Sequence, residues 1–127
     1  MYILYLRETM SLTRLIVFNG YYDIGCALCL MGVFSIPVMN DLHRDMFEGP
    51  LGDMETRLLA TWIFMYGSVR ALYGDHSNRH MVVVSYLLEA LFCFHETLVS
   101  HTMRVDKGLG VMAVSLVFAY MVHNHKS

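Results

Sequence analysis

Charged side chains within apolar stretches are the residues of this sequence most capable of chemistry. Asp23, Arg70, Glu89 and Glu96 lie in such stretches, and a charge left alone at the centre of a bilayer costs about 2.5–3.5 kcal/mol. Carboxylates and a guanidinium in that setting can relay protons or bind a substrate. They can also form ion pairs that fix the rotation and register of helices. Because each acid has an arginine at a suitable depth, the sequence favours structural pairing.

The cysteines and histidines offer weaker kinds of site. Cys26 and Cys29 form a Cys-x-x-Cys pair, but a quinone-coupled thiol oxidase needs that pair near the membrane edge and a second pair in a loop. Only His95 lies within an apolar stretch, whereas a bis-histidine haem needs two facing histidines. His76 and His80 have i, i+4 spacing but lie in a short loop, which disfavours zinc. We therefore expect no catalytic residue, no cofactor and no metal.

The elements that hold these residues follow from composition. The chain has 127 residues, of which 56% are hydrophobic and 16% charged. A soluble domain is usually about 45–50% apolar and about 25% charged. The net charge of −2 provides no electrostatic footprint for nucleic acid. Residues 1–127 are therefore expected to form a single integral membrane domain.

Four apolar runs predict four membrane-spanning helices, at about residues 15–39, 58–73, 81–99 and 108–123. At about 1.5 Å per residue, the first run crosses a hydrocarbon core of about 30 Å. Helices are required because lipid cannot satisfy backbone polar groups. Residues 2–6 are expected to form a short separate helix in the membrane interface. The predicted fold class is all-α, an integral membrane four-helix bundle.

The rise of a helix sets the depth of each charged residue. Asp23 lies eight residues into the first run and Glu89 eight residues into the third, about 12 Å from the same side of the membrane. Arg70 lies three residues before the second run ends on that side, so these three are expected to meet in one layer. Glu96 approaches the other side, where Arg57 opens the second run. A second interhelical ion pair between Arg57 and Glu96 is therefore predicted.

Small residues and one long connection complete the organisation. Gly67 and Ala71, and likewise Ser115 and Ala119, are small-x-x-x-small pairs, which allow helices to approach closely. The acidic connection at residues 40–56 favours a solvated loop over a docking surface for a partner. Lysines and arginines are equally divided between the two sides, so the positive-inside rule gives no orientation.

Over about residues 57–127, the spacing of several residues matches one known family of small four-span proteins. The matching residues are Arg57, Trp62, Arg70, Ser85, Tyr86, Glu96, Arg104, Lys107 and Gly108. At these positions the chain resembles the ergosterol biosynthetic protein 28 family. That family usually has a His-Phe pair where this chain has Phe92 and Cys93. Asp23 and Glu89 have no counterpart in the family pattern.

The resemblance implies a non-enzymatic scaffold of the endoplasmic reticulum membrane that holds the sterol C-4 demethylation enzymes together. Such a tether raises the effective concentration of an intermediate at the next enzyme. Its partners are other membrane proteins, and its apolar grooves are compatible with a bound lipid or sterol. The alternative is an accessory structural subunit of a large organellar complex, such as a respiratory or ATP-synthase assembly of the mitochondrial inner membrane. A third and less favoured interpretation is a small transporter or enzyme that uses Asp23 and Glu89.

Overall fold

In a computed structural model of the chain, residues 2–125 are described, except for the side chains of residues 5–10. Helices account for most of this part, and it contains no β-strand, so the predicted all-α class is confirmed. The elements in chain order are α1 (Tyr2–Leu30), the short 3-10 helix η1 (Arg44–Met46), α2 (Asp53–Tyr73), α3 (Arg79–Phe94), the π-helix η2 (His95–Val99) and α4 (Val105–His123).

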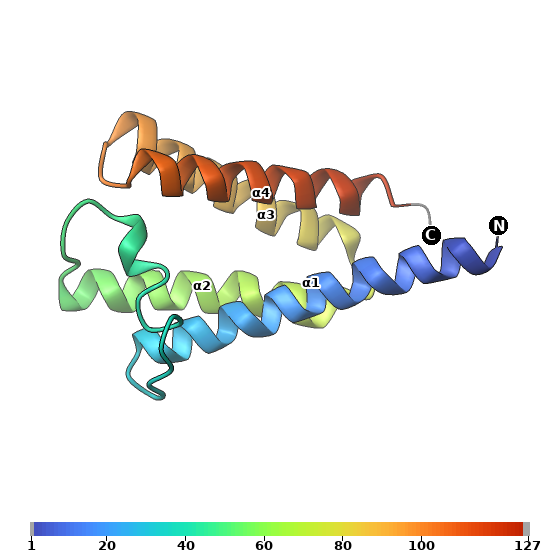
Figure 1. Ribbon diagram of the computed structural model, residues 1–127, viewed down its shortest axis with the longest axis horizontal. Coiled ribbons are helices and arrows are strands. Elements are labelled where there is room, and N and C mark those ends of the chain that lie inside the picture. Colours follow the sequence, from blue (N-terminus) through green and yellow to red (C-terminus); the bar gives the residue numbers. More distant parts are fainter. Residues whose placement is uncertain (1, 126–127) are drawn as a thin grey trace.

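The four long helices are arranged as two hairpins. Helix α1 packs along α2, and α3 packs along α4, whereas α2 and α3 touch each other much less. Figure 1 shows the two hairpins lying one above the other, with both ends of the chain at the same end of the molecule. The α1–α2 connection passes between the hairpins at the opposite end (Figure 1).

The first helix differs from the predicted span of residues 15–39 at both ends. It begins at Tyr2, so the short separate helix expected at residues 2–6 is wrong, because no glycine or proline interrupts the chain before residue 20. It ends at Leu30 because Gly32 adopts a φ of +79°. The amides of Gly32 and Val33 then bond back to the last turn, to the carbonyl oxygens of Cys29 and Leu28, as in a Schellman motif.

The other three predicted helices occur close to their expected positions. Helix α2 begins five residues before residue 58, at Asp53, and ends at Tyr73 as predicted. At its start, the Glu55 carboxylate accepts a hydrogen bond from the amide of Gly52 (3.3 Å), which is one half of a capping box. Helix α3 and the π-helix together cover residues 79–99. Helix α4 starts at Val105 and ends at His123.

Helices α1 and α2 cross at glycines. A Cβ atom added to Gly20 would lie 2.4 Å from the backbone nitrogen of Ala71, and one added to Gly67 would lie 3.0 Å from the carbonyl oxygen of Gly20. The backbones are therefore in direct contact, which small residues alone permit. The predicted pair Gly67 and Ala71 lies at this crossing, whereas Ser115 and Ala119 are buried on α4.

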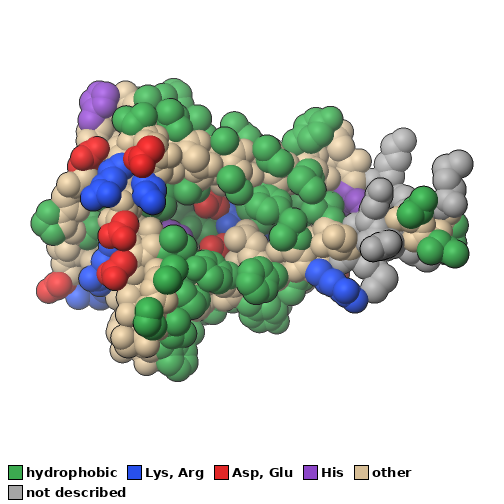
Figure 2. Space-filling model, in the orientation of Figure 1, with side chains coloured by type: hydrophobic (Ala, Val, Ile, Leu, Met, Phe, Trp, Pro, Cys, Tyr) green, Lys and Arg blue, Asp and Glu red, His purple; other side chains and the backbone are tan. Residues whose placement is uncertain are grey.

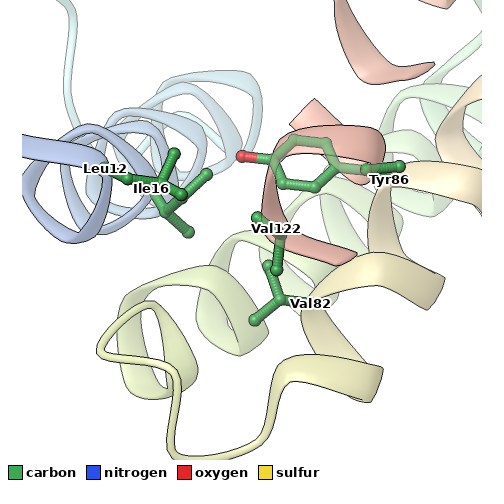
Figure 3. Close-up of a cluster of buried hydrophobic side chains, with 6 residues drawn as sticks. Leu12, Ile16, Val82, Tyr86 and Val122 are labelled. Carbon is green, nitrogen blue, oxygen red and sulfur yellow. The ribbon is translucent and has the colours of Figure 1, made fainter. Parts of the chain in front are cut away.

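Three groups of buried apolar side chains form the core, and two of them join the hairpins. The group near the chain ends joins α1, α3 and α4 (Figure 3): Leu12, Ile16, Val82, Tyr86, Ala119 and Val122. A second group lies within the first hairpin: Ala27, Leu30, Ala60, Ile63 and Tyr66. A third group links the α1–α2 connection to the second hairpin: Met46, Cys93 and Met103.

The α1–α2 connection is attached to the α3–α4 turn through its backbone. A single antiparallel β-bridge joins the two segments. The amide of Glu48 donates to the carbonyl oxygen of Thr102 (2.8 Å), and the amide of Arg104 donates to that of Met46 (2.7 Å). The connection is therefore more than the solvated loop expected for residues 40–56, because its middle part packs into the molecule.

Candidate functional site

A cavity of about 290 Å³ lies between the two hairpins. All four helices and the α1–α2 connection contribute to its lining. Figure 2 shows acidic and basic side chains recessed among hydrophobic ones near the middle of the visible face. The aromatic side chains that line the cavity are Tyr22, Phe47, Trp62, Tyr66, Tyr86, Phe92 and Phe118. The site thus has largely apolar walls around three charged residues, Asp23, Arg70 and Glu89, which form its charged floor.

Arg70 of α2 is the centre of the charged floor. Its side chain is 1% exposed, and its Nη1 atom lies 2.8 Å from Oδ2 of Asp23 on α1. Its Nη2 atom forms a second ion pair with Oε2 of Glu89 on α3. Its Nε atom donates to Oγ of Ser85 (3.2 Å). The structure therefore brings Asp23, Arg70 and Glu89 into the one layer that their depths predict.

Two tyrosine rings enclose the Arg70 guanidinium. The Arg70 Cζ atom lies 4.4 Å from the ring centroid of Tyr66 and 3.7 Å from that of Tyr86, distances at which a cation is attracted to the face of a ring. The Tyr86 hydroxyl donates to Oδ1 of Asn19 (2.6 Å). That same oxygen lies at 3.5 Å from Nη1 of Arg70. Rings and hydrogen bonds together hold the guanidinium in one orientation.

The close crossing of α1 and α2 positions Asp23 against Arg70. A Cβ atom on Gly67 would lie 2.9 Å from the Cβ of Asp23, so a larger residue there would displace Asp23. Arg70 is three residues further along α2, on the same face of the helix as Gly67. The carboxylate of Asp23 is therefore directed at Arg70 by backbone packing as well as by charge.

The predicted pair between Arg57 and Glu96 is wrong. Arg57 is exposed, and no ion pair joins it to Glu96 within the described residues. Glu96 instead accepts a hydrogen bond from the Thr102 hydroxyl and lies 3.3 Å from Nδ1 of His95. Glu96 lines a second hollow, of about 840 Å³, together with Leu58 and Leu59 of α2, whereas Arg57 does not line it. The physical reason is therefore that Arg57 lies on a different face of α2.

Cys26, Cys29 and most of the histidines do not line the cavity, whereas Cys93 does. Cys26, Cys29 and Cys93 are buried free thiols. The rings of His76 and His125 stack with centroids 4.2 Å apart. Burial, and then the charges of His125 and Arg79, lower the pKa of His76. In the part of the chain that the structure describes, no three His, Cys, Asp or Glu side chains are grouped to hold a metal ion.

His43 is a cavity residue that sequence reasoning missed. It belongs to the α1–α2 connection and lines the cavity, and its buried Nδ1 atom has no hydrogen-bond partner among the described residues. Burial, and then the positive charge of Arg70, lower the pKa of His43 to about 4. No local pattern marks this histidine, because the tertiary attachment of the connection to the α3–α4 turn is what places it there.

The pKa of His43 predicts a pH dependence of stability. The ordinary pKa of histidine is 6.5, so between pH 6.5 and 4 the unfolded chain binds a proton that the folded chain does not. The free energy of unfolding should therefore fall as the pH falls through this window, by at most about 1.4 kcal/mol per pH unit. Denaturant unfolding in mild detergent at pH 7, 5.5 and 4.5 measures this effect.

The matched control for this prediction is His43→Gln. Carboxylates that titrate in the same window contribute to both proteins, so the difference between them isolates His43. We expect the variant to lose less stability than the wild type on acidification. Parallel pH profiles for the two proteins would show that His43 is not held neutral by its surroundings.

Several residues that carry the family resemblance meet around Arg70. Ser85 and Tyr86 contact Arg70 directly, and Trp62 and Lys107 line the same cavity. Gly108 packs against Thr97 at the start of α4. The remaining three do not line this cavity: Arg57, Glu96 and Arg104. The structure therefore brings together only part of the pattern, the part around Arg70.

Comparisons of this chain with protein-family models, with curated proteins and with solved structures give no match.

Proposed function

We propose that the chain is an integral membrane protein that acts as a non-enzymatic scaffold for other membrane proteins. The observation that carries the proposal is the distribution of polar and apolar side chains. Charged side chains at the centre of the molecule are buried, whereas large apolar side chains are exposed on the outside of the helices. Arg70 and Asp23 are buried, whereas leucines, valines and aromatic residues are exposed along all four helices. An apolar exterior of this extent marks a surface covered by lipid or by protein.

The two C-terminal helical stretches support insertion in a membrane most directly. Arg79–Val99 and Val105–His123 are long and apolar enough to cross a bilayer. An apolar helix in a soluble protein is normally the core helix and is mostly buried, whereas only 33% and 22% of these two segments are buried within the molecule. Helices α1 and α2 would complete a four-helix membrane bundle, with the paired charges facing its interior as membrane helices require.

The arrangement of the charged floor supports a scaffold over a catalyst. Arg70 makes contacts with Asp23, Glu89 and Ser85, and these contacts connect α1, α2 and α3. A framework of this kind fixes helix register. The resemblance to the ergosterol biosynthetic protein 28 family supports the same role, because the residues that match include those in contact with Arg70.

The exposed apolar part of the α1–α2 connection is the surface we assign to a partner. It lies outside the four helices, and its exposed apolar residues are Met31, Val33, Phe34, Ile36 and Val38. A solvated loop of this composition is unfavourable, because covering large apolar side chains that are exposed to water lowers the free energy. We propose that a partner protein covers it.

Copurification tests this proposal. We expect the tagged full chain to resist alkaline carbonate extraction and, in mild detergent, to copurify with sterol-modifying oxidoreductases. The variant with Phe34→Ser and Ile36→Ser should remain in the membrane and lose those partners. The control variant Val117→Ser, on the exposed face of α4, should keep them. Recovery of respiratory or ATP-synthase subunits would replace the sterol role with the alternative of an accessory subunit, and extraction by carbonate would exclude both.

A further inference from the structure

We propose that the cavity between the hairpins binds the ammonium group of a small amine. The floor holds one guanidinium, Arg70, and two carboxyl groups, Asp23 and Glu89. With both carboxyl groups ionised, it carries an excess of one negative charge beside largely apolar walls. An uncompensated charge in such surroundings is costly, and a bound cation would remove that cost.

Each carboxylate also has one oxygen atom that does not pair with Arg70. Asp23 uses Oδ2 and Glu89 uses Oε2 to pair with Arg70. The remaining oxygen of each carboxylate accepts no hydrogen bond from any residue in the described part of the chain. An ammonium group has N–H donors to offer both oxygens, and hydrogen bonds between two charged groups are among the strongest in proteins.

The lining of the cavity also suits a cation, because much of it is aromatic. Tyr66 and Tyr86 are occupied by Arg70, but Tyr22, Trp62 and Phe92 also line the space and present aromatic surface to a cation or to its apolar part. The volume of about 290 Å³ is at the lower end of the range for ligand pockets, about 300–1,000 Å³. The site therefore fits a compact amine that carries one ring or a short chain.

His43 provides a polar group on the wall of this site. It lines the cavity, and its buried Nδ1 atom has no partner among the described residues. A buried polar atom without a partner is rare in folded proteins. His43 therefore adds a polar side chain to the wall of the cavity, from an element other than the helices that carry Asp23 and Glu89.

Lys107 is the internal cation that competes with this proposal. It lines the cavity and is exposed, and it forms no ion pair with Asp23 or Glu89 among the residues described. If its ammonium group swung inward, it would balance the floor without a ligand. The variant Lys107→Gln separates the two cases.

Trp62 allows the binding experiment to be done on the unlabelled full chain. It is the single tryptophan of the sequence and lines the cavity, so its fluorescence reports on occupancy. The probe is protonated 2-phenylethylamine, added to the purified protein in mild detergent, and its uncharged analogue 2-phenylethanol controls for partition into the micelle. We expect a saturable change with the amine and a dissociation constant about tenfold or more higher for the alcohol.

Charge-neutralising variants complete the test. Glu89→Gln and Asp23→Asn each leave Arg70 with one carboxylate, so each removes the excess charge while keeping one ion pair. We expect both to bind the amine about tenfold or more weakly with a melting temperature close to that of the wild type; if one fails to fold, the other provides the measurement. Lys107→Gln should bind the amine at least as tightly as the wild type does.

Four outcomes would overturn the proposal. Equal affinity for the amine and the alcohol would show that the cavity is merely apolar. Amine binding seen only in Lys107→Gln would identify Lys107 as the resident cation. Absence of a saturable signal, or unchanged affinity in both neutralised variants, would show that the excess charge is balanced without a ligand, by a proton on one of the carboxylic acids.

Discussion

Replacing Arg70 with methionine is expected to abolish stable assembly of the helices. The change leaves Asp23 and Glu89 facing each other across a largely apolar cavity without the guanidinium that pairs with both. Removing one partner of a buried ion pair typically costs about 3–5 kcal/mol, which is a large fraction of the stability of a domain, about 5–15 kcal/mol. Expression level, monodispersity in detergent and thermal unfolding measure the effect.

Two further variants separate loss of charge pairing from loss of packing. Arg70→Met combined with Asp23→Asn and Glu89→Gln removes all three charges, and we expect it to recover much of the lost stability, because no charge is then left unpaired. Arg57→Met on the same helix should have little effect, since Arg57 is exposed and surface charges contribute little. If Arg70→Met assembled as well as Arg57→Met, the ion pairs would have no structural role.

Gly20→Ala is expected to produce the second largest loss of stability. The new Cβ would lie 2.4 Å from the backbone nitrogen and 2.9 Å from the Cα of Ala71, and 2.7 Å from the carbonyl oxygen of Gly67. Backbone atoms cannot move aside singly, so α1 and α2 must separate along the crossing. We expect a loss of about 3 kcal/mol or more. Denaturant unfolding of the variant and the wild type in the same detergent measures it.

The same substitution at Gly110 is the matched control. Gly110 also lies within a helix, α4, and a Cβ there would meet no atom within 4 Å. Alanine favours a helix over glycine by up to about 1 kcal/mol, so Gly110→Ala should keep or raise the stability. A loss at Gly110 equal to that at Gly20 would show that glycine is needed for flexibility instead of for close contact.

The amino-acid sequence by itself determined the helical class and the depth of the buried charges. A helix rises by a constant distance per residue, so positions along the chain predict which side chains share a layer. Asp23, Arg70 and Glu89 are together for that reason. The composition of α3 and α4 likewise predicted two helices with largely exposed apolar surfaces, because hydropathy is a local property of the residues.

Hydropathy and helical rise did not determine where the helices end or how far apart their axes lie. The hydropathy of the first run continues past Leu30, but the backbone conformation of Gly32 ends α1 there. Depth also says nothing about the distance between two helix axes. Arg57 and Glu96 do not pair because Glu96 borders the second hollow, which Arg57 does not line.

The cavity itself was decided by the tertiary structure. It exists because side chains of both hairpins surround the space next to Arg70 without filling it, while apolar groups join the hairpins elsewhere. His43 reaches it through the backbone bridge from Glu48 to Thr102, a contact between segments more than fifty residues apart. Periodicity and composition report which side chains avoid water, whereas the space left between packed elements follows only from how all of them fit together.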